Sequence, residues 1–142
     1  MVPVANVNLL AVLVAAIVMM VLGFVWYSQF AFGKMWMGEM GMSAKSMADK
    51  KKMKQNMPVT FGIMFIGTLV MAYVLAHIVS YTQAKTVLEG AQAGFWVWLG
   101  FVAPTMLSAV LFSGKSVKLY IIDTAHVLVG LLVMGAILAV WV

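Results

Sequence analysis

The chain has 142 residues, of which 65% are hydrophobic and 9% are charged, and it contains no cysteine. This composition excludes a soluble globular domain, and the lack of cysteine excludes disulfides and thiolate metal sites. All nine basic residues are lysine, and the missing arginine argues against a nucleic-acid partner, because arginine is the usual reader of bases and phosphates. We therefore expect an all-α polytopic membrane protein, a single domain of four transmembrane helices in a compact bundle.

Four apolar runs are long enough to cross a bilayer as helices: residues 7–30, 59–82, 91–112 and 117–141. The only long connection is residues 31–57, which glycines interrupt in its first part. Its second part, from about residue 44 to residue 56, predicts a short interfacial helix on the membrane surface. Several lysines of this stretch would lie near anionic headgroups: Lys45, Lys50, Lys51, Lys52 and Lys54.

The lysines are distributed unequally between the two sides of the predicted bundle. Eight of the nine lie in or beside residues 31–57 and 113–117, and only Lys85 falls on the other side. By the positive-inside rule these two loops face the cytoplasm and both termini face outside, in the inner membrane. Aromatic residues fall near both predicted interfaces. We place Trp26, Tyr27, Trp36 and Tyr120 at the inner interface, and Tyr81, Trp96, Trp98 and Trp141 at the outer one.

Small residues at four-residue spacing indicate close helix packing, because they let helix backbones approach in lipid. In the second run these are Thr68, Ala72, Ala76 and Ser80; Gly90 with Gly94, and Gly135 with Ala139, repeat the pattern in the third and fourth runs. The pattern does not identify which helices touch. Four short spans enclose little space, so a solute pathway would require a homo-oligomer.

Asp123 and His126 are ionisable residues inside the fourth apolar run. Ionisable side chains within a span are costly, about 2.5 to 3.5 kcal/mol on insertion scales, and they usually face other protein groups. Helical geometry places both on one face, at the depth of Thr105 and Ser108 in the third run and close to that of Tyr27 in the first. We predict that these five residues form a buried polar cluster in the cytoplasmic half.

Several roles remain open for this cluster. One is a structural hydrogen-bond network in which Asp123 accepts from His126, from a hydroxyl or from Lys118. Another is a proton or ion pathway, since histidine changes its charge near neutral pH. A metal site would need further ligands from a second chain, so we predict no metal or other cofactor. Near the outer end of the second run, Tyr73, His77 and Tyr81 form a separate polar stripe at one-turn spacing.

The sequence also resembles a known family. The motifs that carry this resemblance are Trp26-Tyr27-Ser28, Phe32-Gly33-Lys34 with Trp36, Trp98-Leu99-Gly100-Phe101 with Ala103-Pro104, and Leu111-Phe112 before a small basic loop. Together they resemble the bacterial four-helix membrane family known as domain of unknown function 1761, over essentially the whole chain. The resemblance implies a fold and no established activity.

Two classes of function follow from these residues, and both favour a protein that is not an enzyme, although acid–base catalysis at the cluster stays open. One is a small oligomeric channel or transporter that uses the Asp123 and His126 cluster. The other is a scaffold, accessory subunit or lipid-interaction protein that acts through the basic cytoplasmic loop, where a protein partner would dock. In both cases the lipid bilayer is the surrounding partner, and nucleic acid is not a partner.

Overall fold

The computed structural model describes residues 5, 7–28, 35 and 55–141. Its helices are α1 (Leu9–Trp26), α4 (Met57–Tyr81), α5 (Val87–Val97), the π-helical turn η2 (Trp98–Val102), α6 (Ala103–Leu111) and α7 (Val117–Val140). Because α5, η2 and α6 follow one another without a break, they make one span, so four helices are long and apolar enough to cross a membrane. The predicted all-α, multi-pass membrane fold is therefore confirmed.

Side-chain caps define where helices begin. Asn8 caps α1 by accepting from two backbone N–H groups, and Ser116 caps α7 by accepting from the Leu119 N–H. Thr86 caps α5 in the same way, so the third span starts at Val87, four residues before the predicted boundary. Residues 44–54 of the predicted interfacial helix, with its lysines Lys45, Lys50, Lys51, Lys52 and Lys54, lie outside the described residues.

The first helix is shorter than predicted at its far end, because α1 stops at Trp26. Tyr27 still donates its backbone N–H to the Gly23 carbonyl, but its φ of −93° and ψ of 11° leave the helical range. The 18 residues of α1 rise about 27 Å, slightly less than the hydrocarbon thickness of a typical bilayer. Tyr27 is therefore the first residue after the helical span.

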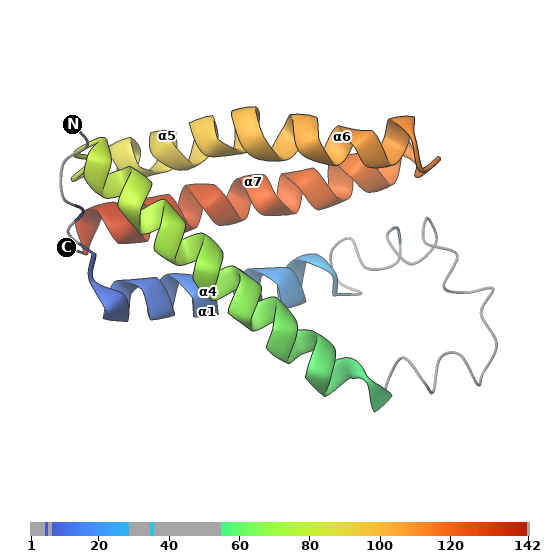
Figure 1. Cartoon of the computed structure of the whole chain (residues 1–142), viewed down its shortest axis with the longest axis horizontal. Coiled ribbons are helices and arrows are strands. Elements are labelled where there is room, and N and C mark those ends of the chain that lie inside the picture. The colour runs from blue at the N-terminus through green and yellow to red at the C-terminus, as the bar shows by residue number, and fades with distance from the viewer. Residues whose placement is uncertain (1–4, 6, 29–34, 36–54, 142) are drawn as a thin grey trace.

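The last helix, α7, is the centre of the bundle and contacts every other helix. In Figure 1, α5 and α6 run alongside α7, α1 lies on its opposite side, and α4 crosses at an angle. The start of α1 and the end of α7 lie at one end, which we call the terminal end. The opposite end, with the start of α4 and the α6–α7 turn, carries Lys115 and Lys118, and we call it the lysine-rich end.

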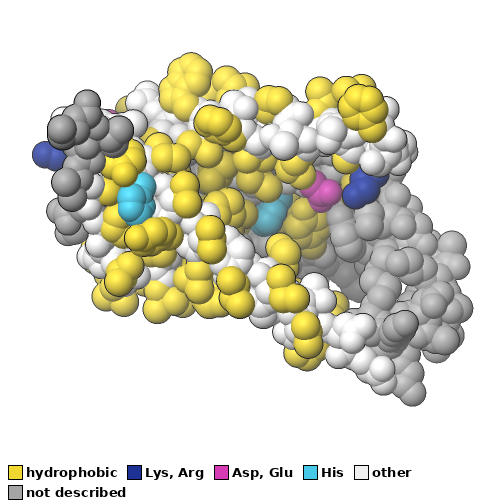
Figure 2. Space-filling model, viewed as in Figure 1, with side chains coloured by type: hydrophobic (Ala, Val, Ile, Leu, Met, Phe, Trp, Pro, Cys, Tyr) yellow, Lys and Arg dark blue, Asp and Glu magenta, His cyan; other side chains and the backbone are white. Residues whose placement is uncertain are grey.

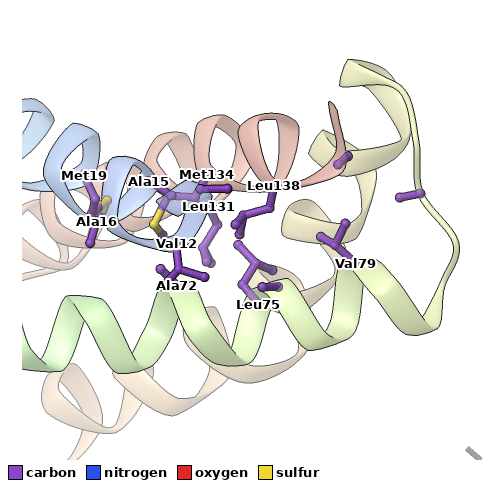
Figure 3. Close-up of a cluster of buried hydrophobic side chains, with 14 residues drawn as sticks. Val12, Ala15, Ala16, Met19, Ala72, Leu75, Val79, Leu131, Met134 and Leu138 are labelled. Atoms are coloured by element: carbon purple, nitrogen blue, oxygen red, sulfur yellow. The ribbon is translucent and has the colours of Figure 1, made fainter. Parts of the chain in front are cut away.

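The hydrophobic core lies between α1, α4 and α7 (Figure 3). Alanines supply much of its surface, with Ala15 and Ala72 fully inaccessible to solvent, which lets the three backbones approach closely. Leu75, Leu131 and Met134 are the largest fully buried side chains and fill the remaining space. The small-residue pattern of the second run lies here: Thr68, Ala72 and Ala76 are buried and Ser80 is half-buried.

Helices α5 and α7 approach even more closely through glycine. A Cβ on Gly90 would lie 2.1 Å from the Gly135 carbonyl oxygen, and one on Gly94 would lie 2.2 Å from the Leu131 carbonyl oxygen. Both distances are far below any real carbon contact, and both neighbours are backbone. The two small-residue patterns predicted for the third and fourth runs therefore pack against each other.

The beginning of α4 diverges from the bundle (Figure 1). Its side chains there are exposed, and a Cβ added to Gly62 or Gly67 would meet nothing within 4 Å. An aromatic contact ties this part to α1, with the ring centroids of Phe24 and Phe61 5.2 Å apart. As a result, α4 does not cover the part of α7 nearest the lysine-rich end.

Candidate functional site

Asp123 lies on the second turn of α7 and accepts a hydrogen bond from Tyr27. The phenol oxygen is 2.6 Å from Oδ1 of the carboxylate. Because α1 ends one residue earlier, at Trp26, the side chain of Tyr27 reaches across to α7 from the helix terminus. In this bond the phenol is the donor and the carboxylate is the acceptor.

The carboxylate of Asp123 has no cationic partner within the described part of the chain. No lysine or histidine nitrogen lies within 4.0 Å of its oxygens, and the side chain is half-buried. Asp123 is six residues into α7 from Val117, which is about 9 Å along the helix. An ionised carboxylate at that depth in a span is expensive unless other groups compensate it.

His126 lies one turn further along the same face of α7. Its ring makes an edge contact with Tyr27, at 5.2 Å between centroids, and lies 6.1 Å from the Trp26 ring. The Nε2 atom is buried and has no hydrogen-bond partner among the described residues. A Cβ on Gly23 would lie 3.3 Å from this nitrogen, so the glycine makes room for the imidazole.

Two indole groups hold the segment of α7 that carries Asp123. The Trp26 Nε1–H donates to the Ile122 carbonyl at 3.1 Å, and the Trp98 Nε1–H donates to the Thr124 carbonyl at 2.8 Å. Trp98 was placed at the outer interface by its position in the sequence. The structure instead points it into the bundle, because an indole N–H that is removed from water needs an acceptor.

The cluster does not include Thr105 and Ser108. Both are exposed, and their hydroxyls donate to carbonyls of their own helix, at Phe101 and Thr105 respectively. The prediction that these two side chains point toward Asp123 assumed a continuous α-helix. In the structure η2 precedes them and adds a residue to one turn. One additional residue rotates the following helix by about 100°, which turns these hydroxyls away from α7.

The hydroxyl that does join the two helices belongs to Tyr120, which donates to the Ala103 carbonyl at 2.7 Å. Ala103 precedes Pro104, where the helix restarts after η2. The contact fixes the start of α7 against α6, and it was not predicted. A tyrosine one turn before Asp123, next to a proline in the neighbouring helix, was the signal that could have suggested it.

A pocket of about 100 Å³ opens beside Asp123, between α6 and α7. It is lined by Met106, Ala109, Val110, Lys115, Leu119, Tyr120 and Asp123. In Figure 2 an acidic side chain lies on this face of the molecule, between a histidine and a basic side chain. Asp123 thus contacts Tyr27 and also lines an open pocket between α6 and α7.

The second predicted site, near the terminal end, exists as a stripe along α4. The His77 ring lies 4.6 Å from the Tyr73 ring and 6.0 Å from the Tyr81 ring, between centroids. The Nδ1 atom of His77 is 2.8 Å from the Tyr73 carbonyl oxygen, and both tyrosines are exposed. The stripe therefore faces outward and is separate from the Asp123 cluster, as the sequence predicts.

Two further expectations concern charged and metal-binding residues. Lys50, Lys51, Lys52 and Lys54 lie outside the described residues. Across residues 55–141 and the described part of the first helix, no group of three or more His, Cys, Asp or Glu side chains could hold a metal ion. The Asp123 cluster itself contains a carboxylate, a phenol and an imidazole, which can exchange protons, form hydrogen bonds and pair with a cation.

Comparisons with known proteins agree with the family suggested by the motifs. Neither curated proteins nor solved structures give a significant match to the chain. One family model does match, described as protein of unknown function (DUF1761), and it covers residues 10–139. That range includes Tyr27, the Asp123 cluster and all four spans except the end residues Leu9 and Val140, and the chain belongs to the DUF1761 family.

Proposed function

We propose that the protein is a small transport protein of the inner membrane, which works as a homo-oligomer and binds a proton or a cation at Asp123. One observation supports this most directly: Asp123 lies inside a span with a single neutral donor, Tyr27, and no cationic partner among the described residues. An unneutralised carboxylate in a span is costly, and the cost is recovered when a proton or a cation binds.

A purely structural role fits the cluster less well. A structural network is expected to satisfy its members, with His126 donating to Asp123. In the described residues the two side chains share no hydrogen bond, and the buried Nε2 of His126 has no partner. Incomplete hydrogen bonding at an ionisable pair favours a site that exchanges protons or ligands.

The hydrophobic core explains why we propose an oligomer. Leu75, Leu131 and Met134 fill the space between α1, α4 and α7 on the terminal side of Asp123. Within the described helices a solute therefore has no polar route through the interior of one copy, and we propose that a pathway uses surfaces from more than one copy. For orientation, the distribution of lysines supports a cytoplasmic lysine-rich end and external termini.

The test is flux in proteoliposomes with a pH gradient and a trapped pH-sensitive dye. We expect the wild-type protein to carry a proton flux that Asp123→Asn reduces at least about tenfold, as loss of the ionisable group implies. Glu89→Gln is the matched control, because Glu89 is an exposed acid at the terminal end that accepts from the Lys85 N–H. If correctly folded Asp123→Asn keeps the wild-type flux, the proposal is wrong.

A second candidate function is a scaffold that docks a protein partner or anionic lipid through residues 31–57. The observation that favours it is the charge of this loop, which contains six of the nine lysines. Replacing residues 43–54 with a neutral linker separates the two functions. The scaffold would lose its co-purifying partner, whereas the transport protein would keep its flux.

A further inference from the structure

The pocket beside Asp123 is lined by two side chains of opposite charge. They are Asp123, on the second turn of α7, and Lys115, two residues before α7 begins. The walls between them are apolar apart from Tyr120, with Met106 and Val110 from α6 and Leu119 from α7. A ligand that fits this pocket needs a cationic end, an anionic end and a short apolar middle.

The two charges do not neutralise each other across the pocket. Lys115 is exposed, and its amine is more than 4.0 Å from the Asp123 carboxylate, so no ion pair joins them. Lys115 lies two residues before Val117, where α7 begins, whereas Asp123 is about 9 Å along the helix axis from Val117. The anionic end of the pocket is therefore the deeper one.

We infer that this pocket binds a short zwitterion, with its ammonium group at Asp123 and its carboxylate or phosphate at Lys115. The inference rests on the proposed function, because it identifies the cation bound at Asp123 as the ammonium of a small dipolar substrate. Charge-assisted hydrogen bonds at both ends provide specificity, since a simple amine satisfies only one of them.

The volume and the charge order limit what this zwitterion is. A pocket of about 100 Å³ takes only a small molecule, so the chain between its two charges is short. An aminophospholipid of the adjacent leaflet has its ammonium on the water side of its phosphate. The pocket has the reverse order, so the source of the ligand is a free molecule from the aqueous side.

The experiment is calorimetric titration of the purified full chain with ω-amino acids of increasing length, from glycine to 6-aminohexanoate. We expect one length to bind best, at least about tenfold tighter than the alkylamine of equal length, because the second charge-assisted bond contributes on this scale. Lys115→Met should remove the preference for the zwitterion over the amine, and Met106→Trp should weaken both by filling the pocket. Lys85→Met, at the terminal end, is the control that should keep the wild-type affinities.

Three results would overturn the inference: no zwitterion binding by the wild-type protein, equal affinity for zwitterion and amine, or an unchanged preference in Lys115→Met. Competition in nanodiscs separates the two sources of the ligand. If phosphatidylethanolamine discs suppress binding relative to phosphatidylcholine discs, the lipid headgroup is the occupant and the assignment to a free ligand is wrong. Proton flux without zwitterion binding overturns this inference alone, whereas binding without flux overturns only the transport proposal.

Discussion

The contact between α5 and α7 gives the sharpest prediction about stability, because alanine is too large for it. A Cβ on Gly90 or Gly94 would lie 2.1 or 2.2 Å from a backbone carbonyl oxygen of α7. Ordinary van der Waals contact begins at about 3.4 Å, so the helices must separate by roughly 1 Å, and backbone atoms cannot rotate away as a flexible side chain can. We expect Gly90→Ala and Gly94→Ala each to lower the free energy of unfolding by about 1 to 3 kcal/mol, the usual cost of overpacking.

The chain contains its own matched controls for this experiment. Gly62 and Gly67 are also helical, but a Cβ at either would meet nothing within 4 Å. The same substitution there should change stability by less than about 1 kcal/mol, with any change favourable, because alanine is the better helix former. The assay is SDS titration of detergent-solubilised protein, followed by tryptophan fluorescence. If Gly94→Ala unfolds at the same SDS fraction as Gly62→Ala, the close α5–α7 approach is refuted.

Three further predictions concern the candidate site and the topology. Tyr27→Phe removes the donor to the Asp123 carboxylate. It should destabilise the protein by about 1.5 to 3 kcal/mol in the same SDS titration, which is the range for hydrogen bonds to charged groups. An unchanged stability would mean that the bond is absent. Trp98→Phe should cost about 0.5 to 1.5 kcal/mol more than Trp96→Phe, because only the Trp98 indole donates to α7 and Trp96 is exposed; equal losses would contradict this. Because the chain has no native cysteine, a thiol reagent can label the single-cysteine variants Ser113→Cys and Thr82→Cys in inverted and right-side-out vesicles. We expect the two cysteines to react from opposite sides of the membrane, with the cysteine at position 113 on the cytoplasmic side.

The existence of the four helices could be predicted from the sequence, but some of their ends could not. Hydrophobic runs longer than a bilayer is thick have few alternatives to a spanning helix, so their number follows from composition. The boundaries depend on individual caps: Thr86 starts α5 four residues early, and α1 stops at Trp26. Such local hydrogen bonds are hard to recognise within a long apolar run in the sequence. The observed helix ends therefore differ from the predicted ones by a few residues.

For the candidate site, the depth of each residue along its helix could be predicted from the sequence, but the direction of its side chain within the bundle could not. Tyr27 and Asp123 meet because both lie near the lysine-rich ends of their helices, which counting residues reveals. Thr105 lies at the expected depth but faces away, because η2 rotates the helix that follows it. A single π-turn is invisible to an argument from regular periodicity, and so is the inward direction of the Trp98 indole.

The position of Asp123 within the bundle limits how a transport cycle could work. The donors around it are neutral, and the nearest cation in the pocket, Lys115, stays beyond ion-pair distance, so the carboxylate can change its occupancy without breaking a salt bridge. The indole contacts from Trp26 and Trp98 hold the α7 backbone rather than the carboxylate, so they fix the site without neutralising it. Since buried apolar side chains block the route toward the terminal end within one chain, release on that side requires α7 to meet a neighbouring copy or to move. A transport protein of this design would therefore lose flux when its copies are separated, while ligand binding in the pocket of each copy would persist.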